Sequence, residues 1–430
     1  MFEYELTVAD VPDPLTPKSD QTFYWHSNKF TPYFKTNVGP RLDSFGVVND
    51  RNIDFVRIAA AVLAADRSSS RSGRLSRWNQ REISLTVDVL SVHPWKKVKD
   101  DLERLLGFLT GDRWHFSFQR RIGKGGQIRM VESDVRRVVL LSGGADSAVG
   151  ALLSAHELAA RGEKHVIVSH WASTILSPLQ SRIAKEIDLL VPGAMADHVK
   201  VHLARGRQAP SGISYGRENS TRSRSLLFIA LGLAVASVNK IPLWIPENGY
   251  ASVNPPLSWS RRGSLSTKTT HPKFLSDLVS LLDSVGAHSN LVNPYANITK
   301  GEMFTQVRDT FGADKASAFL SETSSCSHTG ARKYGISPKV ACGVCFGCVL
   351  RRASFTASGI VDATTYLVPE GDKQVAWLAE KTVIPAMRDF LLEPFGESEL
   401  ARLQLPMSLS LAQVNELCRR GRDELRGLSL

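Results

Sequence analysis

An apolar run that passes through two glycines into a helical pattern constrains this fold more than any other part of the chain. The run begins at Arg137 and continues Val-Val-Leu-Leu-Ser-Gly-Gly-Ala-Asp to Ser147. This order predicts a strand, a tight turn and a helix. The first backbone N–H groups of that helix have no intrahelical partners and carry partial positive charge, so the turn is suited to a phosphate. A capped turn without a ligand is the alternative.

The order Ser-Gly-Gly-x-Asp-Ser directly after a strand is more specific than a pair of glycines alone. It resembles the loop of the PP-loop ATPases, which cleave ATP between its α and β phosphates and activate a carboxylate as an adenylate. The chain has no Gly-x4-Gly-Lys-Ser/Thr motif, which disfavours transfer of the γ phosphate. The resemblance implies that ATP is bound by residues of this glycine loop, namely Leu141, Ser142, Gly143, Gly144, Ala145, Asp146 and Ser147.

Strands and helices alternate after the glycine loop. Strands are predicted at residues 165–170, 198–203 and 243–246, and helices at 148–161, about 178–190 and about 221–239. This alternation predicts an α/β fold with a doubly wound, mainly parallel sheet. The resemblance implies that the fold is of the PP-loop or HUP-like type. Ligands of such sheets bind at the carboxyl ends of the strands.

The residues that follow these strands are therefore candidate binding residues. Ser169 and His170 are placed to meet an adenine, although a single histidine at a strand end is more often structural. Glu247 and Asn248 follow the strand at 243–246 and are candidates for binding the substrate.

The chain has 430 residues, of which 43% are hydrophobic, so it is long enough for several domains. An α+β domain is predicted for residues 1–135, with strands at 2–8, 82–90 and 115–118 and helices at 52–66 and 95–109. This region has no motif that indicates chemistry, so docking of a partner is its expected role. The further predicted units are an ATP-binding α/β domain at 136–320, a cysteine module at 321–360 and a helical extension at 361–430.

The net charge of +11 suits binding to nucleotides, nucleic acid or an acidic protein. No basic tract is interleaved with aromatic residues, which disfavours a dedicated nucleic-acid reader. Solvated charge and phosphate contacts in the active cleft explain the arginines better. There is no apolar run of about 18 residues and no signal-like N-terminus, so we expect a cytoplasmic location and no membrane contact.

Four of the five cysteines lie close together near residue 340. Their spacing suits a tetrahedral zinc site with the ligands Cys326, Cys342, Cys345 and Cys348. Four thiolates leave no open position for water, so the expected zinc is structural. An iron–sulfur cluster is the competing interpretation. Cys418 is expected to be a packing residue.

The glycine loop and the cysteine module together resemble the 7-cyano-7-deazaguanine synthase (QueC-like) family over about residues 137–356. Two further segments match in the family's order: Arg224-Ser225 resembles the Arg-Asn that opens a long helix, and the four residues from Thr299 to Glu302 resemble the Thr-Lys-x-Glu segment. Ser225 replaces the family's Asn, and the segment after Pro246 differs from the family's Asp-Tyr-Ser-Gly-Tyr-Pro-Asp.

The layout of the whole chain resembles the QueC-like component of Qat-type antiphage defence systems. The features that match are the added terminal regions, Glu247-Asn-Gly and the hydroxyl-rich segment 264–272. That resemblance implies partner proteins of a defence system and the cofactors ATP, Mg²⁺ and Zn²⁺. It implies that a deazaguanine-type carboxylate is adenylated and then coupled to ammonia or to a protein amine, giving an amide or a nitrile. The catalytic residues implied are Asp146, Lys300 and Arg224.

Two other functions remain open on the sequence. A tRNA-modifying PP-loop enzyme is supported only by the basic net charge. A non-catalytic, nucleotide-sensing assembly protein would keep the ATP site without turnover.

Overall fold

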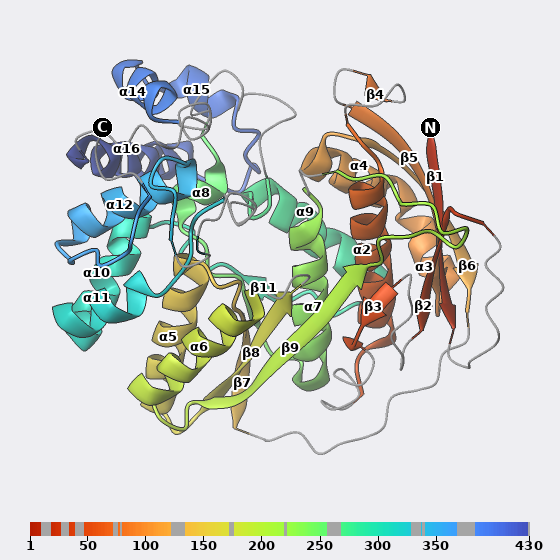
Figure 1. Ribbon diagram of the computed structural model, residues 1–430, viewed down its shortest axis with the longest axis horizontal. Coiled ribbons are helices and arrows are strands. Elements are labelled where there is room, and N and C mark those ends of the chain that lie inside the picture. Colours follow the sequence, from red (N-terminus) through yellow and green to blue (C-terminus); the bar gives the residue numbers. More distant parts are fainter. Residues whose placement is uncertain are drawn as a thin grey trace.

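The computed structural model describes residues 1–9, 19–26, 34–38, 47–71, 76–77, 80–121, 134–171, 176–218, 222–255, 268–327, 337, 340–367 and 383–428. Within these residues, two β-sheets lie side by side with helices between them (Figure 1). The C-terminal helices lie on the side of the molecule away from the N-terminal sheet (Figure 1).

The larger sheet has six strands in the order β11-β10-β7-β8-β9-β3. Their bounds are β3 (Phe34–Thr36), β7 (Val135–Leu140), β8 (Lys164–Trp171), β9 (Met195–Arg205), β10 (Leu243–Trp244) and β11 (Leu291–Val292). Neighbouring strands from β11 to β9 are parallel, and β3 pairs antiparallel with the end of β9. The expected α/β fold with a mainly parallel sheet is therefore confirmed.

The winding of the chain changes direction at β7, which lies between β8 and β10. From β7 the chain passes through α5 (Ala145–Ala159) to β8 and through α6 (Leu176–Leu190) to β9. It then returns through α7 (Arg224–Asn239) to β10, on the other side of β7. Ligands of doubly wound sheets bind at the carboxyl ends of the strands at this point. The glycine loop begins there, directly after β7.

Successive residues at the end of β7 and the start of the glycine loop face opposite sides of the larger sheet. Val138 and Leu140 belong to one apolar core, and Val139 and Leu141 belong to another. α7 packs on the first face, whereas α5 and α6 pack on the second. Both faces are thus covered, as a parallel sheet requires.

The smaller sheet is built from N-terminal residues. Its strands are β1 (Phe2–Ala9), β2 (Thr22–His26), β4 (Ser76–Arg77), β5 (Gln80–Val89) and β6 (Arg113–Arg120). β2, β1, β5 and β6 are parallel neighbours, and β4 pairs antiparallel with β5. The strands expected at 2–8, 82–90 and 115–118 lie at these positions. Their alternating apolar residues predict strands but not the parallel pairing.

Helix α2 (Asp50–Ser68) lies between the two sheets. Fifteen of its 19 residues are buried, and an alanine-rich middle lets neighbouring elements approach closely. α2 packs against α7 on one side and β5 on the other, and Figure 1 shows this layered arrangement. Buried residues of both sheets therefore belong to one continuous apolar core.

The helical pattern at 95–109 corresponds to two helices rather than one. These are α3 (Val92–Lys97) and α4 (Lys99–Thr110). Between them Val98 has φ −104° and ψ 14°, which lies outside helical geometry. The buried leucines of α4 follow helical spacing, as the periodic pattern predicts. The sequence does not indicate the break at Val98.

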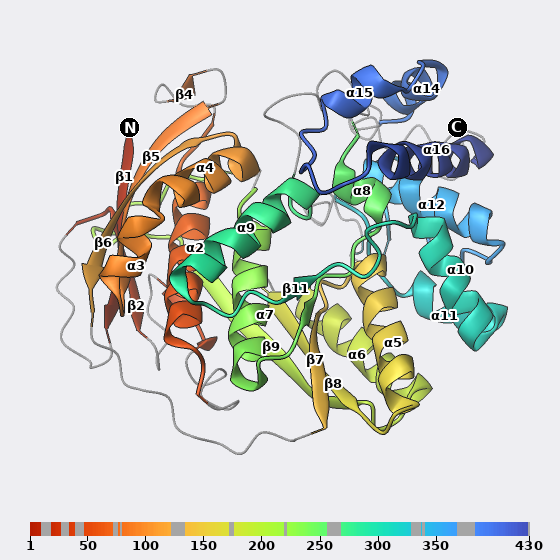
Figure 2. The same ribbon diagram turned by 180° about the vertical axis from the view of Figure 1, so that it is seen from behind.

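The remaining helices build the C-terminal side of the molecule. They are α8 (Gly249–Val253), α9 (Pro272–Val285), α10 (Lys300–Phe311), α11 (Ala313–Ser321), α12 (Phe346–Ser358), α14 (Ile384–Leu392), α15 (Glu397–Ala401) and α16 (Leu411–Gly427). α16 packs on both α12 and α8, as the reverse view in Figure 2 makes visible. Across the described part of the chain, every helix is too short or too polar to cross a membrane.

Candidate functional site

The glycine loop is a tight turn that its own serines brace. Gly143 has φ +96°, a left-handed conformation that favours glycine, and Gly144 precedes the first residue of α5. Ser142 Oγ accepts a hydrogen bond from the Gly144 N–H (3.2 Å). Ser147 Oγ accepts from the Ser142 N–H (3.1 Å) and donates to the Gly144 carbonyl (2.9 Å). The first N–H groups of α5 are thereby held at the carboxyl end of β7, where they can bind an anion.

Asp146, in the first turn of α5, is the centre of a buried polar cluster. Lys300 Nζ lies 3.2 Å from Asp146 Oδ1, and Asn248 Nδ2 donates to Asp146 Oδ2 at 3.0 Å. Glu247 is hydrogen-bonded to Asp146 as well. The structure therefore brings together four predicted site residues from three separate segments of the chain. We call them the Asp146 cluster: Asp146, Glu247, Asn248 and Lys300.

The two carboxyl groups of this cluster have opposite protonation states. Burial opposes ionisation of Asp146, but Lys300 and the hydrogen bonds from Glu247 and Asn248 hold its pKa below the ordinary value. Burial and the negative charge of Asp146 raise the pKa of Glu247 well above the ordinary value. The raised pKa favours the protonated form of Glu247, which donates to the Asp146 carboxylate.

Local sequence explains how Lys300 reaches the cluster. Thr299 and Glu302 form a capping box, in which each side chain accepts a hydrogen bond from the other residue's N–H. Lys300 is the first residue of α10, so the cap fixes the start of the helix that carries it. Glu424 of α16 adds a second support, because it accepts from the Gly301 N–H at 3.1 Å and from the Thr299 hydroxyl.

α16 also supports the other side of the Asp146 cluster. Asn248 caps α8, where its side chain accepts from the Ala251 N–H at 2.9 Å. The next helical residues pack on α16: a Cβ at Gly421 would lie 2.4 Å from the ring of Tyr250, which is 1% exposed. One helix thus holds both Asn248 and Lys300. No local pattern in the sequence assigns this role to Glu424 or Gly421, because the contacts join residues far apart in the chain.

The two residues predicted to meet an adenine are used inside the fold. Ser169 Oγ donates to the Leu141 carbonyl (2.8 Å) and is hydrogen-bonded to His198 Nε2 (2.9 Å). His170 Nε2 donates to the Leu203 carbonyl (3.0 Å), and burial lowers the pKa of His170 to about 4. His170 is thus neutral, and these contacts favour the structural interpretation of its side chain.

Arg224 is not among the groups that contact or perturb Asp146 and Glu247. It is the exposed first residue of α7, and its charge contributes to the lowered pKa of His170. Within the described part of the chain, Arg224 forms no ion pair with a carboxylate. The structure therefore places this predicted catalytic residue beside β8 and apart from Asp146 and Lys300.

The four predicted metal ligands lie together. All four Sγ atoms of Cys326, Cys342, Cys345 and Cys348 are within 4.8 Å of one another. The Sγ atoms of Cys342 and Cys348 are 3.8 Å apart, which equals the sulfur–sulfur separation of about 3.8 Å expected for tetrahedral Zn–S bonds of ~2.3 Å. The cluster can therefore hold a metal ion such as zinc.

The cysteine cluster is joined to the glycine loop through the chain that enters it. Ser324, two residues before Cys326, donates its N–H to the Gly143 carbonyl at 3.0 Å. Arg351 of α12 is fully buried and donates to Thr323 Oγ1 and to the Leu320 carbonyl, both at 2.6 Å. A metal that orders Cys326 thus also orders a contact of the candidate phosphate site.

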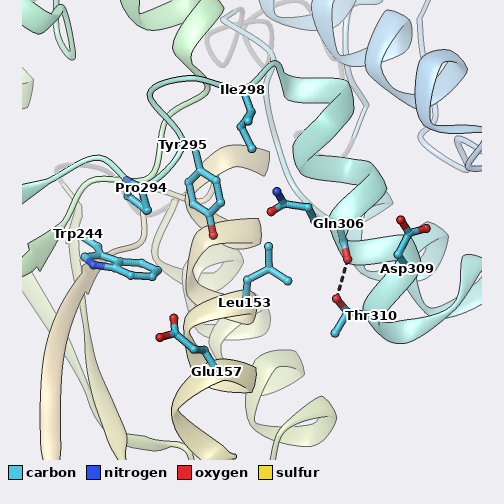
Figure 3. A pocket seen from close by; sticks show the side chains of 9 residues that line it. All are labelled: Leu153, Glu157, Trp244, Pro294, Tyr295, Ile298, Gln306, Asp309 and Thr310. Carbon is cyan, nitrogen blue, oxygen red and sulfur yellow. Dashed lines mark hydrogen bonds between the residues drawn. The ribbon is translucent and has the colours of Figure 1, made fainter.

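A separate pocket of about 490 Å³ lies between α5, α10 and the segment after β11 (Figure 3). Leu153 and Glu157 line it from α5, and Trp244 and Tyr295 close its other side. Leu153 lies about two helical turns beyond Asp146. The pocket contains none of the predicted site residues.

No protein-family model matches the chain, and no curated protein is significantly similar to it. The family relationship expected from the motifs stays a prediction. Residues 264–267 of the hydroxyl-rich segment lie outside the described residues. The case for a function therefore depends on the geometry of the site.

Proposed function

We propose that the chain is an ATP-dependent, AMP-forming ligase of the 7-cyano-7-deazaguanine synthase type. The observation that carries the proposal is the position of the Asp146 cluster. It adjoins the glycine loop at the point where the sheet changes direction, and it joins a carboxylate, a carboxylic acid and an ammonium group. Such a site combines an anion-binding helix terminus with groups that can stabilise charge on a phosphate and a carboxylate.

In the proposed reaction, a carboxylate oxygen of a deazaguanine-type substrate bonds to the α phosphorus of ATP as the bond to the bridging oxygen breaks. Pyrophosphate leaves toward the N–H groups of the glycine loop. An amine then attacks the acyl carbon and loses a proton to water, AMP leaves, and an amide remains. With ammonia as the amine, a second activation gives the nitrile.

The side chains have distinct roles in this proposal. The Lys300 ammonium stabilises negative charge on the α phosphate, and Glu247 and Asn248 hold Asp146 in place or contact the substrate. Asp146 Oδ1 is a buried carboxylate oxygen whose neighbour is Lys300 Nζ at 3.2 Å, and a carboxylate oxygen at this position could also bind Mg²⁺. Bound Mg²⁺ would supply neutralisation of the phosphate charge. Arg224, whose charge acts on His170, would contact a part of the ligand that extends toward β8.

For the cysteine cluster we propose a structural zinc. Four thiolates fill a tetrahedral shell, so no position is left for water or substrate. Metal analysis of the purified chain separates zinc from an iron–sulfur cluster, which would be coloured and contain inorganic sulfide.

Our proposals for the source of the amine and for the biological setting depend on the resemblance of the chain's layout to a defence-system protein. We propose that a partner protein of an antiphage defence system supplies the amine and that the N-terminal region docks it. An activity that consumes ATP belongs in the cytoplasm.

The test is ATP turnover by the purified chain, resolved into AMP and ADP, with and without 7-carboxy-7-deazaguanine. We expect AMP only with that compound, and a decrease on the order of a hundredfold in Asp146→Asn and Lys300→Met. Asp309→Asn removes an exposed carboxylate from the same helix as Lys300 and should leave turnover unchanged.

Formation of ADP instead of AMP, or AMP formation that persists in Asp146→Asn, would contradict the proposal. Binding of ATP without any turnover, even with candidate partners added, would instead favour the nucleotide-sensing function.

A further inference from the structure

Four arginines without an ion pair in the described part of the chain meet at the carboxyl ends of β8 and β9. Arg67 lies in the last turn of α2, Arg205 ends β9, Arg217 lies in the following loop and Arg224 begins α7. None of the four forms an ion pair with any carboxylate in the described part of the chain. We call this group the arginine cluster.

The loop after β9 is folded so that it brings these side chains together. The Glu218 N–H donates to the Arg67 carbonyl at 3.0 Å, and a Cβ at Gly216 would lie 2.1 Å from the Ser68 carbonyl oxygen. The loop is therefore pressed against the end of α2. Arg205 is fixed beneath it, with its guanidinium 4.7 Å from the ring centre of Tyr215.

Only some of the N–H donors of the Arg205 guanidinium form hydrogen bonds with described residues of the protein. Its guanidinium donates to the carbonyls of Gly206 (2.6 Å) and Gly216 (3.3 Å), but its buried Nε has no acceptor among the residues that the structure describes. The surrounding protein displaces water from the Arg205 and Arg224 guanidinium groups and, together with the charge of Arg67, lowers the pKa of both, although part of the Arg224 side chain stays exposed. The fold thus holds like charges close together, an arrangement that a bound anion would stabilise.

The nearest carboxylates are occupied by other partners. Asp66 accepts from the N–H groups of Arg222 and Ser223, both at 3.1 Å, and pairs with Arg81. Asp112 pairs with Arg71 and Arg81. The region contains the arginines Arg67, Arg71, Arg81, Arg205, Arg217, Arg222 and Arg224, against the carboxylates Asp66, Asp112 and Glu218. Within the described residues, positive charges therefore outnumber carboxylates in this region, and Asp66 is the one carboxylate whose charge acts on Arg67.

We propose that the arginine cluster binds the phosphates of a phosphate-bearing ligand, at a site separate from the glycine loop. Guanidinium groups match phosphate oxygens in pairs of parallel hydrogen bonds. An oligophosphate places several negative charges in a small volume, whereas a single carboxylate supplies only one. Arg67 and Arg205 are half-buried and only Arg217 and Arg224 are exposed, a recessed arrangement that suits a compact ligand.

The proposed site and the glycine loop both lie at the carboxyl ends of the strands of the larger sheet. The loop follows β7, and the arginine cluster lies two strands away at β9, a separation of about 10 Å. A ligand bound there can lie next to a nucleotide bound at the loop. The inference does not depend on adenylation and holds whether or not the chain is a ligase.

The test is isothermal titration with inorganic tripolyphosphate. We expect two equivalents to bind the wild-type chain, and Arg67→Gln/Arg217→Gln to lose one of them or to bind it at least about tenfold more weakly. Neither side chain forms a hydrogen bond or ion pair with a described residue, so the fold should persist, as a melting curve would verify. The matched variant Arg67→Lys/Arg217→Lys keeps the charge and should retain most of the binding.

Two further variants separate this inference from the proposed function. Gly143→Val distorts the glycine loop at a positive φ and should lose the other equivalent only. Arg161→Gln removes an exposed charge just beyond the end of α5, at the amino ends of the strands, and should change the binding of neither equivalent.

Unchanged binding in Arg67→Gln/Arg217→Gln would overturn the inference, whatever Gly143→Val does. If the wild-type chain bound a single equivalent and Arg67→Gln/Arg217→Gln removed it, the glycine loop would bind no phosphate. That result would count against the proposed function and leave the inference standing. If citrate, a tricarboxylate, bound the arginine cluster as tightly as tripolyphosphate does, the assignment of the site to phosphate ligands would be overturned.

Discussion

Asp146 and Glu247 illustrate how one site can contain two carboxyl groups with different charges. A lysine and two donors surround Asp146, whereas Glu247 faces the Asp146 carboxylate and is removed from water. The environment therefore favours one proton on the pair, and that proton lies on Glu247. The lowered pKa of Asp146 and the raised pKa of Glu247 place the two titrations of this pair below and above the range in which exposed carboxylates titrate.

Glu247→Gln should stabilise the chain at neutral and higher pH. The pKa of Glu247 is raised in the folded state, so its favourable contribution is complete below about pH 4.5 and is lost as the pH rises toward the folded-state pKa. Glutamine stays neutral and can donate to Asp146 in the same way. The stability difference between variant and wild type should be near zero at pH 4 and increase by about 1.4 kcal/mol per pH unit above 4.5.

Urea denaturation from pH 4 to 8.5 measures this difference. Glu322→Gln, which removes an exposed carboxylate paired with Arg182, serves as the control and should show no such increase. A difference that stays constant with pH would mean that Glu247 is ionised in the folded chain.

The residues of the site differed in how far the sequence could predict them. Asp146 and Lys300 belong to local patterns, a glycine loop and a capping box, whose geometry a few neighbouring residues determine. Arg224 also belongs to a local pattern, but its distance from Asp146 depends on where α7 starts above the sheet. Glu424 has no local pattern, because only packing of α16 brings it to Thr299.

At the scale of elements, α16 acts as a support for two other helices. It contacts α8 beside Asn248 and α10 beside Lys300. The C-terminal extension is therefore joined to the candidate site directly, by hydrogen bonds and by the buried ring of Tyr250.

Glu424→Ala should destabilise the chain and weaken the binding of MgATP. The substitution leaves the Gly301 N–H and the Thr299 hydroxyl without their acceptor at the start of α10, at a cost of about 1–3 kcal/mol. Lys300 is the first residue of that helix and would lose its fixed position. Urea denaturation and titration with MgATP measure the two effects.

Glu416→Ala is the matched control, because it removes an exposed glutamate from the same helix and should cost much less. If Glu424→Ala were as stable as Glu416→Ala and bound MgATP normally, the support assigned to α16 would be refuted.

Removal of the metal from the cysteine cluster should loosen the glycine loop. Cys326→Ser takes away one of four ligands, and Ser324, two residues earlier, donates to the Gly143 carbonyl. We expect lower metal content and faster hydrogen exchange at residues 141–147, measured by elemental analysis and mass spectrometry. Cys418→Ala changes a buried cysteine outside the cluster and should keep the metal. Full metal content in Cys326→Ser would show that Cys326 is not a ligand.

Four strands of the larger sheet, β7 to β10, were predictable because they are apolar runs in a chain that alternates strands and helices. The short strands β3 (Phe34–Thr36) and β11 (Leu291–Val292) were not predicted. The break between α3 and α4 was not predictable, since the apolar spacing continues across Val98. The pairing of β3 with β9 joins Phe34 to Arg205, and no pattern in either segment indicates the other.

For the whole molecule, the important feature is that α2 and α7 are buried together between two sheets. Asp66, at the end of α2, caps the start of α7 and pairs with Arg81 of β5. This one carboxylate therefore contacts both halves of the shared core.

Asp66→Asn should destabilise both sheets at once. Loss of this charge leaves Asp112 as the remaining carboxylate partner of Arg81 and weakens the acceptor of the Ser223 N–H, which costs about 1–3 kcal/mol. Because the core is continuous, hydrogen exchange in β5 and in β7 should accelerate together. Asp50→Asn, at the exposed start of α2, is the control and should have little effect. Faster exchange in β5 with unchanged exchange in β7 would mean that the two sheets unfold independently.

The burial of α2 on both sides also limits the order in which a growing chain can fold. The ribosome completes α2 long before it reaches α7, so the apolar surface that α7 covers stays exposed during the synthesis of all the intervening strands and helices. Contacts between segments this far apart form slowly. We therefore expect the nascent N-terminal half to bind chaperones until Asn239 has left the ribosome.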